Sequence, residues 1–139
     1  MVDYARIERK FKQLAKNLAF LKSAATLSKE DFAANYEKIL ACERSLQICL
    51  EIVFDVADII LSPLKEIDVD VETDLLDILR QRNIISKELE NALIQLDFVI
   101  DVILCEYLED HNKMVYQLIT NELGNFEQYE LEIKKYLGE

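Results

Sequence analysis

The side chains that could take part in chemistry gather between residues 97 and 111. Asp97 and Asp101 are four residues apart, so on a helix they share one face. That spacing suits a carboxylate pair for acid–base work or Mg²⁺ binding, and it also suits a polar stripe facing solvent or a cation across an interface. Cys105, Tyr107 and His111 follow. Because His111 lies six residues after Cys105, we expect it in a surface or capping role rather than as a displaced catalytic base.

The cysteine and histidine content argues against a metal centre or a disulfide framework. The chain has three cysteines and one histidine, with no Cys-x-x-Cys pair, so we expect no bound metal and no cofactor. Cys42 and Cys49 are seven residues apart on one predicted helix, about 10 Å along its axis, which is too far for a disulfide. We expect them to be buried thiols of a protein in a reducing compartment.

The elements that position these residues are long amphipathic helices. With only two glycines and one proline in 139 residues, the chain has few turn signals. Apolar residues recur at steps of three and four, which is typical of helices with one buried face. This spacing predicts a single all-α domain over residues 1–139, an antiparallel four-helix bundle with an additional short helix. The predicted helices cover residues 4–21, 29–61, 73–82, 87–108 and 111–136, with a loop at 64–72.

The helix predicted from Lys29 to Leu61 is apolar on more than one side. Its main stripe includes Tyr36, Leu40 and Leu46, and Glu43 interrupts that stripe by its spacing. We interpret Glu43 as a partly exposed or interface charge, because the sequence indicates no ionisable partner. Further apolar residues widen the surface, and a second subunit is the simplest means of covering it. The predicted dimer interface comprises Ile48, Ile52, Val56, Ile59, Ile100, Ile103, Leu104 and Tyr107.

The charge balance limits the partners of the chain. It has 16 Lys and Arg against 27 Asp and Glu, a net charge of −11, which repels nucleic-acid phosphates. The best local basic patch comprises Arg6, Arg9, Lys10, Lys12 and Lys16, and a solvated helix face is the preferred interpretation of it. RNA binding is therefore expected to be weak. No apolar run reaches a membrane span and the N-terminus is charged, so we expect a cytoplasmic protein without membrane contact.

The segment Phe98-Val-Ile-Asp-Val-Ile-Leu-Cys-Glu-Tyr107 resembles the signature helix of the HepT-like branch of the HEPN domains. Members read roughly Phe-Arg-Asn, three mostly apolar residues, then His-Glu-Tyr and an acidic turn. In this alignment Ile100 takes the place of the motif arginine, Asp101 that of the asparagine and Cys105 that of the histidine, whereas Tyr107 is retained. Residues 36–52, 76–89 and 115–129 also resemble family segments in order and spacing. The resemblance implies a HEPN, or nucleotidyltransferase substrate-binding-subunit-like, fold.

The resemblance also implies a ribonuclease site that this chain has lost. In active relatives the motif arginine and histidine of two subunits meet at the dimer interface and cleave RNA without a metal. Histidine moves protons near neutral pH and arginine stabilises phosphorane charge. Ile100 does neither, and Asp101 adds negative charge where a scissile phosphate would lie. Carboxylates beside Cys105 disfavour its thiolate. We therefore expect no catalytic residues, although residual enzyme activity stays open.

Tyr107 is the motif residue that could still react. In toxin–antitoxin systems of this family, a minimal nucleotidyltransferase transfers AMP to the motif tyrosine and silences the nuclease. Tyr107 could be such an acceptor, or an amphipathic aromatic residue packed at an interface. We predict a HepT-like component of a HEPN/minimal-nucleotidyltransferase module, acting as a catalytically degenerate dimeric binding or regulatory subunit. The alternatives are a ribonuclease toxin with a substituted site, neutralised through Tyr107, and a helical adaptor unrelated to toxins.

Overall fold

The computed structural model describes residues 2–64, 72–105 and 111–139 of the chain. Within these ranges every regular element is a helix. The elements in chain order are α1 (Tyr4–Ala24), α2 (Lys29–Ala33), α3 (Tyr36–Leu61), α4 (Thr73–Gln81), α5 (Lys87–Cys105), α6 (His111–Asn121) and α7 (Gly124–Tyr136). Most of the loop predicted at 64–72, and the end of the helix predicted to reach residue 108, lie outside the described residues.

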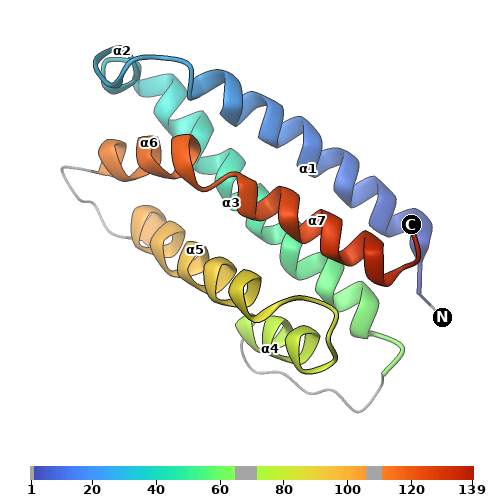
Figure 1. The fold of residues 1–139 in the computed structure, drawn as a ribbon. Helices are drawn as coiled ribbons and strands as arrows, with labels where there is room; N and C mark the ends of the chain where they lie inside the picture. The colour runs from blue at the N-terminus through green and yellow to red at the C-terminus, as the bar shows by residue number, and fades with distance from the viewer. Residues whose placement is uncertain (1, 65–71, 106–110) are drawn as a thin grey trace.

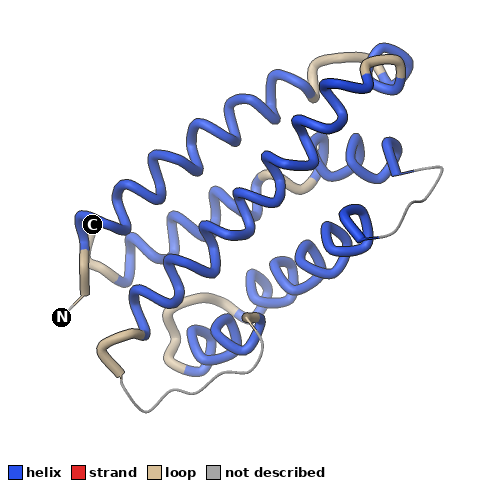
Figure 2. The backbone as a smooth tube through the Cα atoms, turned by 180° about the vertical axis from the view of Figure 1, so that it is seen from behind, coloured by secondary structure: helices blue, strands red, loops and turns tan. Residues whose placement is uncertain are grey.

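Four antiparallel rods form the bundle, and these are α1, α3, α5 and the α6–α7 pair (Figure 1). Seen from the opposite side, α3 lies between α1 and α5 (Figure 2). The two described ends of the chain lie at one end of the bundle, whereas α2 and the start of α6 lie at the other (Figure 1). The predicted all-α antiparallel bundle is confirmed, with the difference that both α2 and α4 are additional short helices.

The helix predicted over residues 29–61 is wrong at its start, because the chain turns between α2 and α3. Ser28 caps α2, its hydroxyl accepting a hydrogen bond from the Asp31 backbone N–H at 3.1 Å. Asn35 caps α3 in the same way, its side chain accepting from the Lys38 N–H at 3.1 Å. Asparagine is a favoured N-cap because its oxygen satisfies a free backbone donor. As a result of the turn, Tyr36 and Leu40 are exposed instead of belonging to the buried stripe.

The last predicted helix is likewise two helices, α6 and α7. Glu122 and Leu123 form a turn before Gly124, which begins α7. The placement explains how Gly124 is tolerated, since glycine is unfavourable only in a helix interior. Tyr129 then fixes α7 to α3, because its buried hydroxyl donates a hydrogen bond of 2.8 Å to the Val53 carbonyl.

Helix α3 is the centre of the core. It packs against α1, α2, α4, α5, α6 and α7 of the same chain. Ile52, Val56 and Ile59 are therefore buried within one chain, and Ile48 is partly buried. The wide apolar surface that the sequence indicated is covered by helices of the same molecule. A second subunit is not needed to explain it, and the prediction that these side chains form a dimer interface loses its basis.

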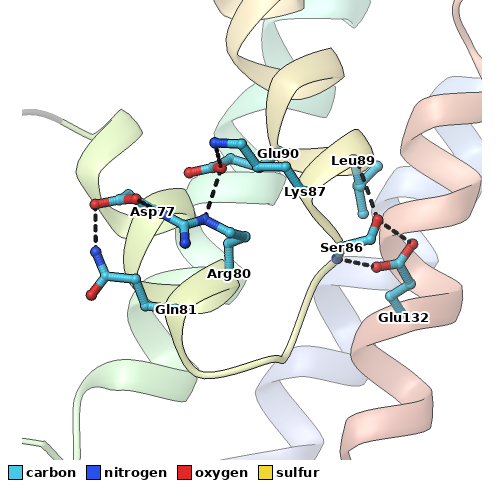
Figure 3. Close-up of polar contacts among 8 residues, drawn as sticks. All are labelled: Asp77, Arg80, Gln81, Ser86, Lys87, Leu89, Glu90 and Glu132. Atoms are coloured by element: carbon cyan, nitrogen blue, oxygen red, sulfur yellow. Dashed lines mark hydrogen bonds and ion pairs between the residues drawn. The ribbon is translucent and has the colours of Figure 1, made fainter.

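A polar cluster joins α4 to α5 and α5 to α7 (Figure 3). Glu90 is only 3% exposed, and its Oε1 accepts hydrogen bonds from Arg80 Nε at 3.0 Å and Lys87 Nζ at 3.1 Å. Ser86 caps α5, its hydroxyl accepting a hydrogen bond from the Leu89 N–H at 3.2 Å. The Ser86 backbone N–H also donates to Glu132 of α7 at 2.6 Å. These contacts set the position at which α5 enters the bundle.

Candidate functional site

Helix α5 has two different faces, and the residues aligned with the family motif are divided between them. Ile100 is 2% exposed and packs in the core together with Ile103. Asp101 and Cys105 are exposed on the opposite side. The helical period explains the division, because residues one turn apart share a face whereas adjacent residues do not. A guanidinium at position 100 would therefore enter the core rather than join Cys105 at the surface.

Asp101 and Cys105 are in direct contact. The Cys105 thiol donates a hydrogen bond to Asp101 Oδ1 at 3.4 Å. The thiol therefore faces a carboxylate, whose negative charge disfavours the thiolate that a nucleophilic cysteine needs. The third motif residue, Tyr107, lies outside the described residues.

The exposed side of α5 also carries apolar side chains, and we call residues Ile94, Phe98, Asp101 and Cys105 the α5 outer face. Phe98 is 69% exposed, and Ile94 and Leu104 are also exposed. Leu104 is thus the predicted interface residue of described α5 that lies at the surface, since Ile100 and Ile103 are buried. Phe98 and Ile94 were not among the predicted interface residues. Their spacing was an available signal, because Ile94 precedes Phe98 by four residues and Phe98 precedes Asp101 by three, which places all three on one helix face.

Carboxylates border the α5 outer face. Burial raises the pKa of Asp97, and the nearby Asp101 raises it further. Burial also raises the pKa of Glu72 at the start of α4, with added repulsion from Asp97 and from Asp55 and Glu51 of α3. Asp97 and Asp101 thus belong to an acidic surface that spans three helices. Such a surface repels a phosphate backbone.

The predicted basic patch on α1 is dispersed. Arg6, Arg9, Lys12 and Lys16 are exposed, in agreement with a solvated helix face. Lys10 instead forms an ion pair with Asp55 of α3, at 2.9 Å between Nζ and Oδ2. This pair holds one cation of α1 beside the acidic surface.

Glu43 and His111 form a pair that the sequence did not indicate. Glu43 on α3 is 8% exposed, and its Oε1 lies 2.8 Å from Nε2 of His111, the first residue of α6. Burial raises the pKa of Glu43, and the charge of His111 lowers it in part. The interpretation of Glu43 as a partly exposed charge without an ionisable partner is wrong. His111 does begin a helix, but its ring binds a buried carboxylate and is not simply a surface group.

Two of the cysteines lie in the core of the bundle. Cys42 and Cys49 are buried as predicted, and burial raises the pKa of the Cys42 thiol to about 11 and that of Cys49 to about 12. These thiols are therefore inert toward chemistry that requires a thiolate.

Among the described residues, no three His, Cys, Asp or Glu side chains are grouped so that they could hold a metal ion. Within the same ranges, no helix combines the length and hydropathy required to span a membrane.

A family model identifies the family of this chain. The family model described as "Ribonuclease HepT-like" matches residues 14–133. Because this match covers most of the chain, the protein belongs to the HepT-like family. A search of curated proteins found no match.

Solved structures share the fold at low identity. A tri-AMPylated HEPN toxin of Shewanella oneidensis, in complex with an MNT antitoxin, is 20% identical with a TM-score of 0.83, over 93% of this chain and 96% of that chain. A mutant of the MntA-HpeT toxin–antitoxin has values of 20% and 0.84, over 93% and 97%. YutE of Bacillus subtilis, a cytosolic protein of unknown function, has 20% and 0.81, over 98% and 91%.

Proposed function

We propose that the chain is the HepT-like component of a HEPN/minimal-nucleotidyltransferase module, in which it is a dimeric binding or regulatory subunit without ribonuclease activity. The observation that carries this proposal is the division of α5. The position aligned with the motif arginine is a buried isoleucine, and the positions aligned with the polar motif residues are an aspartate and a cysteine that contact each other. An acidic surface beside them supports the same conclusion, because RNA cleavage needs cations near the phosphate.

The proposed partner rests on the family and on the relatives. The HEPN toxin of Shewanella oneidensis was solved in complex with an MNT antitoxin, and it shares the fold of this chain over nearly its whole length. We propose that this chain also pairs with a minimal nucleotidyltransferase encoded beside it.

The α5 outer face is the proposed contact between two copies. Phe98 is the most exposed large apolar side chain of α5, and Ile94, also exposed, lies one turn before it on the same side. Exposed aromatic residues of this kind are frequent centres of interfaces. Phe98→Asp should convert a dimer to a monomer in sedimentation velocity at micromolar concentration. Phe20→Asp on α1, also an exposed phenylalanine, is the matched control and should leave the sedimentation coefficient of the wild type unchanged. A monomeric wild type would contradict the proposed dimer.

Absence of nuclease activity has a direct test. The purified chain, incubated with total cellular RNA, should leave the RNA intact, and its expression should not slow growth. Cleavage that disappears in Cys105→Ala would overturn the proposal in favour of a toxin with a substituted site.

Tyr107 motivates that second candidate, because the acceptor tyrosine of the motif is present and a relative carries AMP groups in its solved structure. In this candidate the chain is a ribonuclease toxin that the partner nucleotidyltransferase neutralises by transferring AMP from ATP to the Tyr107 hydroxyl, with release of pyrophosphate. Incubation with the partner and ATP should then add one adenylyl mass to the wild type and to Tyr136→Phe, but not to Tyr107→Phe. RNA cleavage by the unmodified chain, lost after this modification, would distinguish the toxin from the regulatory subunit.

A further inference from the structure

A cavity of about 480 Å³ opens at the end of the bundle where the two described ends of the chain lie. Its volume is in the range of roughly 300–1,000 Å³ that is usual for small-molecule sites. The residues that line it come from the start of the chain, the end of α3, the turn after α4 and the end of α7. None of them lies on α5, so the cavity is separate from the α5 outer face and does not depend on the proposed function.

Most of the lining is aliphatic. The buried side chains of Ile60, Leu61 and Ile84 close the floor of the cavity. Leu64 and Tyr136 lie at its rim, where they are 38% and 53% exposed. Two large apolar side chains that are distant in the sequence thus face water at the same cavity. A ligand with an apolar group would cover them and gain the free energy of removing apolar surface from water.

Arg82 is the charged residue of the described lining. Within the described part of the chain, its guanidinium has no ion-pair or hydrogen-bond partner. Arg80, two positions earlier, is by contrast bound by Asp77 and Glu90. The N–H donors of Arg82 are therefore available to a ligand. A guanidinium binds a carboxylate through two parallel hydrogen bonds, so Arg82 suits a ligand that carries a carboxylate.

Three of the described helices end at this cavity, and their ends limit the charge that a ligand can carry. Leu61 is the last residue of α3, Tyr136 is the last of α7, and Arg82 follows the last residue of α4. The carbonyls at the end of a helix carry roughly half a negative charge, and Pro63 has no N–H to satisfy one of those of α3. The helix ends therefore favour an ammonium group and oppose a lone anion, whereas Arg82 opposes a lone cation. A zwitterion satisfies both.

We propose that this cavity binds a free α-amino acid with an aliphatic side chain, the chemistry of leucine. The side chain of the ligand contacts Leu64 and Tyr136 above the aliphatic floor. Its carboxylate binds the Arg82 guanidinium, and its ammonium donates hydrogen bonds to carbonyls at the helix ends. Each of the three groups of the ligand has its own counterpart in the cavity, so the loss of any one of them weakens binding.

The test uses the full chain, with L-leucine as the probe and backbone amide NMR as the readout. Leucine should produce saturable shifts centred on residues 60–64, 82–84 and 136. Glycine lacks the side chain, 3-methylbutylamine lacks the carboxylate and 4-methylpentanoate lacks the ammonium. Each should bind at least about tenfold more weakly than leucine, a loss of about 1.4 kcal/mol.

Several results would overturn the proposal. These are the absence of saturable shifts with leucine, shifts centred elsewhere, and binding of any of the three other compounds as tightly as leucine. N-acetyl-leucine imitates the C-terminal residue of a protein, because its nitrogen is an uncharged amide. Tighter binding of N-acetyl-leucine than of leucine would show that the cavity takes a protein terminus instead of a free amino acid.

A variant of Arg82 tests the proposed carboxylate contact. Arg82→Gln should weaken leucine at least about tenfold without weakening 3-methylbutylamine, because it removes only the attraction for the carboxylate. Arg9→Gln makes the same change of charge at an exposed position of α1 and should leave the affinity for leucine unchanged. An unchanged affinity for leucine in Arg82→Gln would contradict the proposal.

A variant of Tyr136 tests the proposed apolar contact. Tyr136→Ala removes part of the rim and should weaken both leucine and 3-methylbutylamine at least about threefold. Tyr36→Ala, at an exposed tyrosine at the start of α3, is the matched control and should leave both affinities unchanged. Both tyrosines are exposed, so both variants should keep the NMR spectrum of the folded wild type away from the changed residue. An unchanged affinity for leucine in Tyr136→Ala would likewise overturn the proposal.

Discussion

Two buried glutamates lie at opposite ends of the bundle, and they are neutralised in different ways. Glu90 accepts hydrogen bonds from Arg80 and Lys87, whereas Glu43 faces the single imidazole of His111. Glu90 is thus shared by two cationic side chains, whereas Glu43 has one partner and a pKa that burial raises. The first arrangement suits a fixed joint between α4 and α5, and the second makes the contact of α3 with α6 sensitive to pH.

Removal of Glu90 should have the largest effect on stability. Glu90→Ala leaves two cations without their shared acceptor and opens a cavity beside α4. We expect the free energy of unfolding to fall by about 2–3 kcal/mol, less than for a fully enclosed ion pair because both cations reach solvent. Urea denaturation followed by circular dichroism would measure the loss. Glu88→Ala, at an exposed position of the same helix, is the control, and an equal loss in both variants would refute a specific role of Glu90.

Removal of the imidazole should have a smaller effect that depends on pH. His111→Phe leaves Glu43 buried without a partner, which should cost about 1–2 kcal/mol at pH 7.5. Burial raises the folded-state pKa of Glu43 above its ordinary value of 4.5. Protonated Glu43 therefore contributes fully to the free energy of unfolding below pH 4.5, and this contribution is lost as the pH rises through the folded-state pKa.

The defect of His111→Phe should accordingly be small at pH 4.5 and grow toward pH 7.5, as urea denaturation at several pH values can show. The double variant E43Q/H111F is the control, because it has no carboxyl to titrate. A defect of His111→Phe that is equally large at both pH values would show that packing, rather than charge, binds the two helices.

Replacement of Glu43 by its amide should have the smallest effect. The Glu43→Gln side chain keeps an oxygen that accepts from the His111 ring, and it carries no charge to bury. We expect a change between zero and a gain of about 1 kcal/mol in the free energy of unfolding at pH 7.5. A loss of more than about 1 kcal/mol would mean that the charge itself stabilises the contact, which would remove the contrast with Glu90.

The sequence predicted the fold because helical spacing is a local property. The first predicted helix, residues 4–21, depends on apolar residues one turn apart, and in α1 the structure buries Ile7, Phe11, Leu14, Leu18 and Leu21. The turn between α2 and α3 and the turn between α6 and α7 were not predicted, because the apolar spacing continues across both. Asn35 and Gly124 were the available signals of these turns. A wide apolar face on a helix also does not indicate how many helices of the same chain cover it. Ile52 and Val56 were therefore assigned to an interface with a second subunit.

The site was less predictable, because its contacts join distant parts of the chain. Glu43 and His111 are 68 residues apart by their numbers, and neither position contains a local signal of the other. The position of Ile100 in the core was implicit in the helical period, since Ile103 and Leu96 lie on the same side. Alignment with a motif identifies equivalent positions but not the face on which each one lies.

The turn at Glu122 and Leu123 has a consequence for local opening. It interrupts the continuous backbone hydrogen bonds of the fourth rod, so α6 and α7 need not unravel together. The second half is held by the buried bond from Tyr129 to Val53, and the first half by the titratable contact with Glu43. Amides of the first half should therefore exchange with deuterium sooner, giving the rod a slow half and a fast half within one folded molecule.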